Sequence, residues 1–252
     1  IIPTLLKLRV ESGLLRLSVG LNGDAILLGG NLEDVLGDHT VDRFEFVDGT
    51  VLTFHELVDR GIEVSGTDGE DQLVGTNLGD RILGGAGTDV LEGGAGSDRY
   101  VFEVGDGRDR VQDTSVAGEE NEVLFGPGIS PDQLALGLVH DSNLSNQHDL
   151  ELKVGQTGDA LVLDTFDATD VLGARTIQTF RFSDGMSLTY DQLVARGFDV
   201  GGTDGDDRLV GTNLVDRVRA GNGNDTIQTA SGDDILDGEG GDDRLQGGSG
   251  SD

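Results

Sequence analysis

Aspartate recurs at nine-residue intervals along two stretches of this chain, and these carboxylates are its most evident chemical groups. Ten units place Asp at the sixth position, and glycine fills the fourth position in eight of them. The aspartates are Asp71, Asp80, Asp89, Asp98, Asp207, Asp216, Asp225, Asp234, Asp243 and Asp252. Carboxylates and accessible turn carbonyls are the oxygen ligands that Ca²⁺ accepts in sets of roughly six to eight. The pattern therefore predicts a hard divalent cation, with calcium favoured over magnesium, whose octahedral geometry is more rigid.

A nonapeptide is too short to fold alone, so neighbouring units must position these turns. The units run from Gly66 to Val101 and from Gly202 to Asp252. Two units can form one coil of turn, strand, turn and strand, in which glycine allows the tight bends. Strand alternation then points the eighth residue of each unit inward. The inward residues are Leu73, Ile82, Leu91, Tyr100, Leu209, Val218, Ile227, Leu236 and Leu245.

Each coil has two turns, so turns on the same side recur every eighteen residues. Each turn offers backbone carbonyls and one Asp carboxylate, and this spacing alone allows more than one arrangement of ligands. A core of one apolar residue per strand is too thin to hold the coils, so metal binding must contribute to folding.

The units GGAGTDVLE and GGAGSDRYV, at 84–101, resemble the calcium-binding repeat of secreted bacterial RTX (repeats-in-toxin) proteins. The resemblance implies an all-β fold, a right-handed parallel β-roll, with one Ca²⁺ between the carboxylates of consecutive same-side turns. The implied pairs are Asp71 with Asp89, Asp80 with Asp98, Asp207 with Asp225, Asp225 with Asp243, Asp216 with Asp234, and Asp234 with Asp252. The implied turn glycines at the metal are Gly85, Gly87, Gly94, Gly96, Gly221 and Gly223. The expected affinity is that of an extracellular calcium module, about 0.1–1 mM.

The first two units of each block depart from the glycine pattern. Threonine takes the second position at Thr67, Thr76, Thr203 and Thr212, and leucine takes the fourth at Leu78 and Leu214. We expect these units to bind weakly or to cap the blocks. Other residues replace glycine in the second block, at Ala220, Thr229, Ala230 and Glu239. Its sites should therefore be less regular than those of Asp89 and Asp98.

Acidic residues dominate the composition: 48 Asp and Glu stand against 17 Lys and Arg, which gives a formal net charge of −31. A compact chain with this charge repels itself, and a chain rich in Gly and Asp tends toward disorder without a counter-ion. The charge argues against nucleic acid and anionic membranes as partners. The absence of cysteine excludes a disulfide framework and a thiolate metal site. Calcium ions are therefore the expected partners.

A longer repeat joins each block to the region before it. Residues 49–82 match residues 185–218 at an offset of 136. We therefore expect a β-rich spacer followed by nonapeptides, twice. The expected segments are a truncated spacer at 1–65, a β-roll block at 66–103, a second spacer at 104–201 and a truncated block at 202–252. We expect both chain ends to be fragment boundaries, and IIPTLLKLRV is too short for a convincing signal peptide.

The spacers should contain hairpins and short helices. Turn residues at 48–49 and 183–185 lie between apolar runs and predict two hairpins. The spacing of Thr53 and Glu56, repeated by Thr189 and Gln192, is that of a capping box, so a short helix should follow each hairpin. The spacer resembles the haemolysin-type calcium-binding related region that accompanies such repeats, a family with no activity to transfer.

Catalytic chemistry has little support in these residues. The chain contains no HExxH, GxSxG or GxGxxG motif. Its four histidines lie in the spacers without the spacing of metal ligands, at His39, His55, His140 and His148. We therefore expect no enzyme activity and no catalytic residue.

The leading hypothesis is a calcium-binding structural module of a larger secreted protein, which folds on meeting Ca²⁺ outside the cell. The resemblance implies type I secretion from a Gram-negative bacterium and an extracellular or cell-surface location. One alternative is an adhesive or carbohydrate-binding module with a cell-surface or polysaccharide target, although the chain has few aromatic residues. The other is a non-catalytic appendage of a secreted hydrolase or epimerase.

Overall fold

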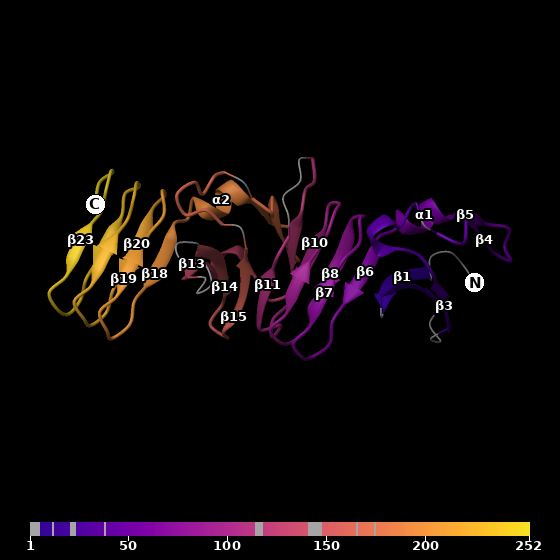
Figure 1. The fold of residues 1–252 in the computed structure, drawn as a ribbon, viewed down its shortest axis with the longest axis horizontal. Helices are drawn as coiled ribbons and strands as arrows, with labels where there is room; N and C mark the ends of the chain where they lie inside the picture. The colour runs from indigo at the N-terminus through magenta and orange to yellow at the C-terminus, as the bar shows by residue number, and fades with distance from the viewer. Residues whose placement is uncertain are drawn as a thin grey trace. The chain divides into compact units, whose positions relative to one another are not determined.

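The computed structural model describes residues 6–11, 13–20, 24–37, 39–113, 118–140, 148–164, 166–173 and 175–252. The chain divides into two compact units, Ile1–Gly126 and Pro127–Asp252. Short strands dominate both units, and the two α-helices among the described residues are each five residues long (Figure 1). The all-β class expected from the sequence is confirmed.

The first unit begins with a spacer and continues into coiled strands. Its elements are β1 (Leu6–Glu11), β2 (Leu14–Val19), β3 (Asp24–Leu28), η2 (Leu32–Asp34), β4 (Arg43–Glu45), β5 (Val51–Thr53), α1 (Phe54–Val58), β6 (Ile62–Ser65), β7 (Gln72–Val74), β8 (Asp80–Leu83), β9 (Val90–Glu92), β10 (Arg99–Phe102), β11 (Arg108–Val111) and β12 (Glu122–Phe125).

The coiled strands of the first unit form two parallel ladders. One ladder runs β6, β8, β10 and β12, and the other runs β7, β9 and β11. Ile82 pairs with Tyr100 in the first ladder and Leu73 with Leu91 in the second, both at an offset of eighteen residues. Successive strands thus alternate between ladders, which is the parallel β-roll expected from the repeats.

The second unit has the same order of parts. Its elements are η3 (Pro131–Gln133), β13 (Leu134–His140), β14 (His148–Val154), β15 (Asp159–Leu163), β16 (Thr179–Phe182), β17 (Ser187–Thr189), α2 (Tyr190–Val194), β18 (Phe198–Gly201), β19 (Arg208–Val210), β20 (Asp216–Arg219), β21 (Thr226–Gln228), β22 (Ile235–Asp237) and β23 (Arg244–Gln246).

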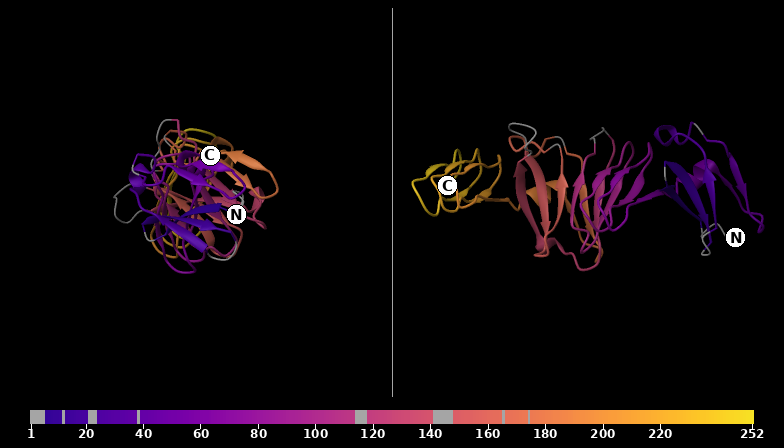
Figure 2. Two further views of the ribbon diagram at one scale, coloured as in Figure 1. Left: turned by 90° about the vertical axis from the view of Figure 1, so that its right-hand side faces the viewer. Right: turned by 60° about the horizontal axis from the view of Figure 1, so that its bottom comes forward.

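Its nonapeptide block repeats the coil of the first unit. Parallel ladders run β18, β20 and β22 on one side and β19, β21 and β23 on the other. Figure 2 shows these strands in yellow as successive coils that lie side by side. The spacer strands before them, β13, β14 and β15, are antiparallel instead.

The predicted hairpins and helices of the spacers are confirmed. β4 pairs antiparallel with β5, and β16 with β17, around turns in which Gly49 and Gly185 have positive φ. α1 and α2 each begin with a capping box, formed by Thr53 in the first unit and Thr189 in the second. Local sequence therefore determines these elements, because turn glycine and cap residues act over only a few positions.

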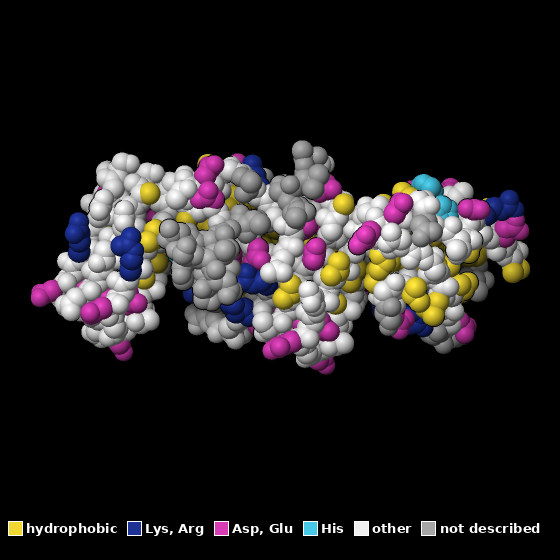
Figure 3. Space-filling model, viewed as in Figure 1, with side chains coloured by type: hydrophobic (Ala, Val, Ile, Leu, Met, Phe, Trp, Pro, Cys, Tyr) yellow, Lys and Arg dark blue, Asp and Glu magenta, His cyan; other side chains and the backbone are white. Residues whose placement is uncertain are grey.

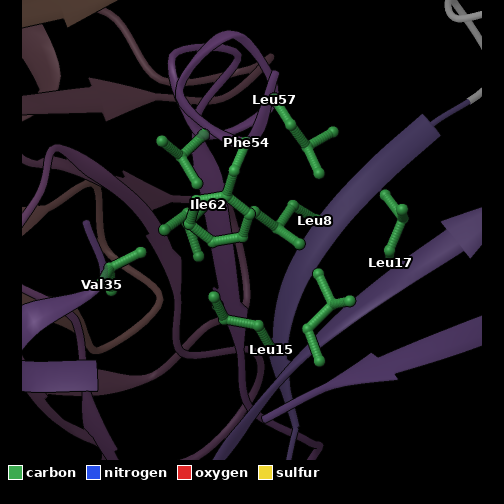
Figure 4. Close-up of a cluster of buried hydrophobic side chains, with 9 residues drawn as sticks. Leu8, Leu15, Leu17, Val35, Phe54, Leu57 and Ile62 are labelled. Carbon is green, nitrogen blue, oxygen red and sulfur yellow. The ribbon is translucent and has the colours of Figure 1, made fainter. Parts of the chain in front are cut away.

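The buried apolar clusters differ in size between the first spacer and the second block. In the first unit, Phe54 of α1 lies beside Leu8 and Ile62 in a cluster of nine buried apolar residues (Figure 4). In the second block, the buried cluster contains Val218, Ala220 and Ile227. The coils of the second block thus have a small apolar core, and apolar burial is what offsets the loss of chain entropy.

The inward direction of the eighth residue is confirmed where coils lie on both sides. Ile82, Leu91 and Ile227 are at most 1 % exposed, whereas Leu245 of the final described coil is 44 % exposed. Stacking therefore creates the core, and a coil with a neighbour on one side covers its apolar residue only partly.

Candidate metal centre

Aspartates eighteen residues apart are joined by a hydrogen bond between a backbone amide and a side chain. In each pair, the amide of the first Asp donates to Oδ1 of the second, over 2.7–3.1 Å. All six predicted pairs do this: Asp71 with Asp89, Asp80 with Asp98, Asp207 with Asp225, Asp216 with Asp234, Asp225 with Asp243, and Asp234 with Asp252. Each carboxylate therefore lies against the preceding same-side turn.

The second carboxylate oxygen, Oδ2, differs in its surroundings among the ten predicted aspartates. In four of the ten it is buried and accepts no hydrogen bond: Asp89, Asp98, Asp225 and Asp234. These residues are between 0 and 3 % exposed. A buried anionic oxygen without a partner is strongly unfavourable, so it calls for a proton or a cation. These buried oxygens without a hydrogen-bond partner are therefore suitable ligands for Ca²⁺.

Threonine satisfies the same oxygen in the opening units of each block. The amide and the hydroxyl of Thr76 both donate to Asp80 Oδ2, at 2.6 and 3.0 Å. Thr67 and Thr203 do the same for Asp71 and Asp207, and the amide of Thr212 donates to Asp216. In these opening units, threonine therefore supplies hydrogen bonds to Oδ2. The expectation that these units bind weakly or cap the blocks stays a prediction.

Glycine allows successive same-side turns to approach each other closely. A Cβ on Gly85 would lie 2.1 Å from the carbonyl oxygen of Thr67, and one on Gly94 would lie 2.3 Å from that of Thr76. Only glycine permits this approach at positive φ. The six glycines predicted at the metal all have positive φ: Gly85, Gly87, Gly94, Gly96, Gly221 and Gly223. Turn carbonyls therefore face the next turn on the same side.

Burial changes the protonation of these carboxylates. It raises the pKa of Asp80 to about 6, against the opposing hydrogen bonds from Thr76, and it raises the pKa of Asp216 to about 6. The pKa of Asp98 rises to about 7, chiefly through burial and then through nearby negative charges, including that of Asp80. A cation beside these groups would reverse the shift, because it favours the ionised form.

Within the described residues, no three or more His, Asp or Glu side chains gather at one point. A cation at these turns would therefore take its remaining ligands from backbone carbonyls and water. Calcium accepts such mixed oxygen sets. Figure 3 shows many other acidic side chains, in magenta, exposed on the surface, where water solvates them.

The sequence interpretation missed two contacts between spacer and block. The side chain of Asn77 accepts from the amide of Val35, and that of Asn213 accepts from the amide of Val171, an equivalent contact 136 residues later. The backbone amide of each Asn also donates to a spacer carbonyl. Leu78, next to Asn77, packs against the first spacer core. The repeated Thr-Asn-Leu sequence was the signal, and it marks where the spacer docks on the block.

The interpretation also missed two coil turns after Val101. Residues 104–112 and 116–124 place Asp109 and Asn121 at the sixth position, but two and then three inserted residues break the nine-residue frame. The amide of Asp89 donates to Asp109 Oδ1 and the amide of Asp98 donates to Asn121 Oδ1. The hydrogen-bond pattern of the block therefore continues through β11 and β12.

Two family descriptions match the chain. The RTX calcium-binding nonapeptide repeat matches residues 65–100, 201–227 and 219–252. The haemolysin-type calcium binding protein related domain matches residues 149–192. The repeat family binds Ca²⁺, and neither description is that of a catalytic domain.

The chain was also compared with individual curated proteins and solved structures. No curated protein matches this chain. A similar solved structure is that of the extracellular lipase LipA from Serratia marcescens, at 22 % identity and a TM-score of 0.30. The match covers 73 % of this chain and 28 % of the lipase, so the chain spans about a quarter of that protein's length.

No helix in the described part of the chain has the length and hydropathy needed to cross a bilayer. The fold, the stacked aspartate turns and the family matches agree with one another. The two blocks are RTX calcium-binding nonapeptide repeats, and the second spacer contains a haemolysin-type calcium binding protein related domain.

Proposed function

We propose that this chain is a structural module of a larger secreted bacterial RTX protein, in which Ca²⁺ outside the cell drives the nonapeptide blocks to fold. The ten sixth-position aspartates and the turn glycines would hold the ions. The four buried Oδ2 atoms without a hydrogen-bond partner carry this proposal. The proposal keeps the expected order of spacer, block, spacer and block, and it extends the first block from residue 103 through β12.

The two carboxylate oxygens of each Asp would have different roles in binding the ions. Asp Oδ1 fixes the spacing of same-side turns by accepting the amide of the preceding Asp, as in Asp80 and Asp98. Asp Oδ2 and the turn carbonyls remain as oxygen donors. A bound Ca²⁺ supplies the positive charge that offsets mutual repulsion of the carboxylates.

Binding energy at these turns is folding energy, because the unfolded chain has no preformed site. The small buried cluster of the second block supports this coupling. In a compartment poor in calcium the blocks would stay extended, which suits export through a narrow channel. The proposed location is therefore extracellular, and the proposed role is structural and non-enzymatic.

Circular dichroism during a calcium titration tests the proposal. The β-sheet signal should grow with a midpoint between about 0.1 and 1 mM Ca²⁺, the affinity range of extracellular modules, and equal Mg²⁺ should give little change. Addition of EGTA should reverse the change. An identical spectrum in EGTA and in saturating Ca²⁺ would contradict the proposal.

A target for the parent protein stays a prediction. The expected cell-surface or polysaccharide partner would be bound through parts of that protein or through the spacer surface. A glycan array probed with and without calcium measures this directly, and binding that requires Ca²⁺ would favour an adhesive role for the module.

A further inference from the structure

The last turn of the first block is covered by a segment outside the regular repeats. The amide of Gly96 donates to Glu119 Oε1 at 2.8 Å, and the amide of Glu120 donates to Ser97 Oγ at 3.0 Å. The amide of Asp98 donates to Asn121 Oδ1 at 2.8 Å. Residues 119–122 therefore occupy the place of another same-side turn.

This covering turn has a different arrangement of charge from a regular repeat. Its sixth position is Asn121, so the carboxylate that a repeat would supply there is missing. Its fourth position is Glu119, where a regular unit has glycine. Glu119 thus places a carboxylate at the fourth position of the unit, where the regular repeats have none.

Two buried carboxylate oxygens are left without partners at this turn. They are Asp98 Oδ2 and Glu119 Oε2, and Asp98 is 1 % exposed. Burial is the main cause that raises the pKa of Asp98, and the negative charges of Asp80, Asp113 and Glu119 add to it. The neighbouring guanidinium of Arg99 is paired with Glu122. This turn thus has two buried carboxylate oxygens without a hydrogen-bond partner, while the adjacent Arg is engaged elsewhere.

We infer that Asp98 and Glu119 bind a divalent cation of the calcium class at the end of the first block. This inference rests on the proposed function, since it takes Asp98 to be a metal ligand. It adds a site whose second carboxylate lies outside residues 65–100, which the repeat family matches. Backbone carbonyls and water complete the ligand set, as calcium allows.

Calcium stoichiometry of the full chain tests the inference, with Glu119→Gln as the variant and Glu120→Gln as its matched control. Both substitutions remove one negative charge from adjacent residues, but Glu120 is exposed. Glu119→Gln keeps an oxygen that can accept the Gly96 amide. Equilibrium dialysis with calcium should find one ion fewer per chain in Glu119→Gln and the wild-type number in Glu120→Gln.

The outcomes separate this inference from the proposed function. A wild-type chain that takes up no calcium would defeat both. Wild-type uptake with an unchanged number of ions in Glu119→Gln would overturn the end site alone, and the buried pair would then share a proton. Should Glu119→Gln lose its β-sheet spectrum in saturating calcium, anomalous diffraction from wild-type crystals decides instead. A calcium peak between the Asp98 and Glu119 carboxylates supports the site, and a filled neighbouring turn without that peak overturns it.

Discussion

At the scale of single residues, the second position of a nonapeptide determines what its aspartate needs. Thr76 donates two hydrogen bonds to Asp80 Oδ2, whereas Gly94 leaves Asp98 Oδ2 without a partner. Both carboxylates are buried, at 3 and 1 % exposure. A threonine hydroxyl thus supplies to Oδ2 part of what a cation would supply, and we expect the Thr-capped turns to depend less on calcium.

Asp225→Asn and Asp207→Asn test this difference at the same repeat position. Asp225 Oδ2 is buried and unpartnered, while Thr203 caps Asp207 Oδ2. We expect Asp225→Asn to raise the half-saturating calcium concentration about tenfold, or about 1.4 kcal/mol, and Asp207→Asn to raise it by less than about threefold. Isothermal titration calorimetry measures both. Equal effects, or a larger effect of Asp207→Asn, would refute the role of the threonine cap.

The raised pKa values predict that protons compete with calcium. Without calcium, the folded pKa values of Asp80 and Asp216 are about 6 and that of Asp98 about 7, above the ordinary value of 3.8. The folded apo chain therefore binds more protons than the unfolded chain, and its stability falls as pH rises from about 4 to about 7. Calcium affinity should rise over the same interval, because the ligands must be ionised.

Calcium titrations between pH 5 and 8 in buffers of different ionisation enthalpy measure this linkage. Proton release on binding should be largest near pH 6 and vanish near pH 8. An affinity that is constant from pH 5 to pH 8, without proton release, would show that these carboxylates are already ionised in the folded apo chain.

At the scale of elements, each short strand contributes one inward side chain, and stacking buries it. Ile227 of β21 is fully buried between its neighbours, whereas Leu245 of β23 is 44 % exposed. Both residues occupy the eighth position of a unit. The contribution of a strand to stability therefore depends on the coils beside it.

Ile227→Ala and Leu245→Ala measure that contribution in saturating calcium. Ile227→Ala should reduce the free energy of unfolding by about 2–5 kcal/mol through lost burial and a residual cavity. Leu245→Ala should reduce it by less than about 1.5 kcal/mol, because water already reaches this side chain. Urea denaturation followed by circular dichroism gives both values. Similar losses in the two variants would contradict a core built by stacking.

The sequence predicted those elements whose determinants are local or strictly periodic. The inward residues, the two hairpins and the capped helices follow from spacing over a few residues, as Thr53 and Glu56 illustrate. The turns that carry Asp109 and Glu119 were not predicted, because insertions shift them out of the nine-residue frame. The docking role of Asn77 was not predicted either, since it depends on a spacer loop 42 residues away. The metal role of the predicted aspartates stays a proposal.

At the scale of the whole molecule, the first spacer has a larger buried apolar cluster than the second nonapeptide block. Nine buried apolar residues form the cluster of the first spacer, but three form that of the second block. The net charge of −31 opposes compaction throughout. Calcium dependence should therefore be concentrated in the nonapeptide blocks, and the spacers should keep more structure without it.

Hydrogen–deuterium exchange with and without calcium tests the central claim, that cations between successive turns hold the coils together. Peptides from β7–β10 and β19–β23 should exchange within seconds in EGTA and become strongly protected in about 10 mM Ca²⁺, roughly tenfold above the weakest affinity of extracellular modules. Peptides from β1, β2 and α1 should change less, because an apolar core supports them. Equal protection of the two blocks in EGTA and in calcium would contradict the account.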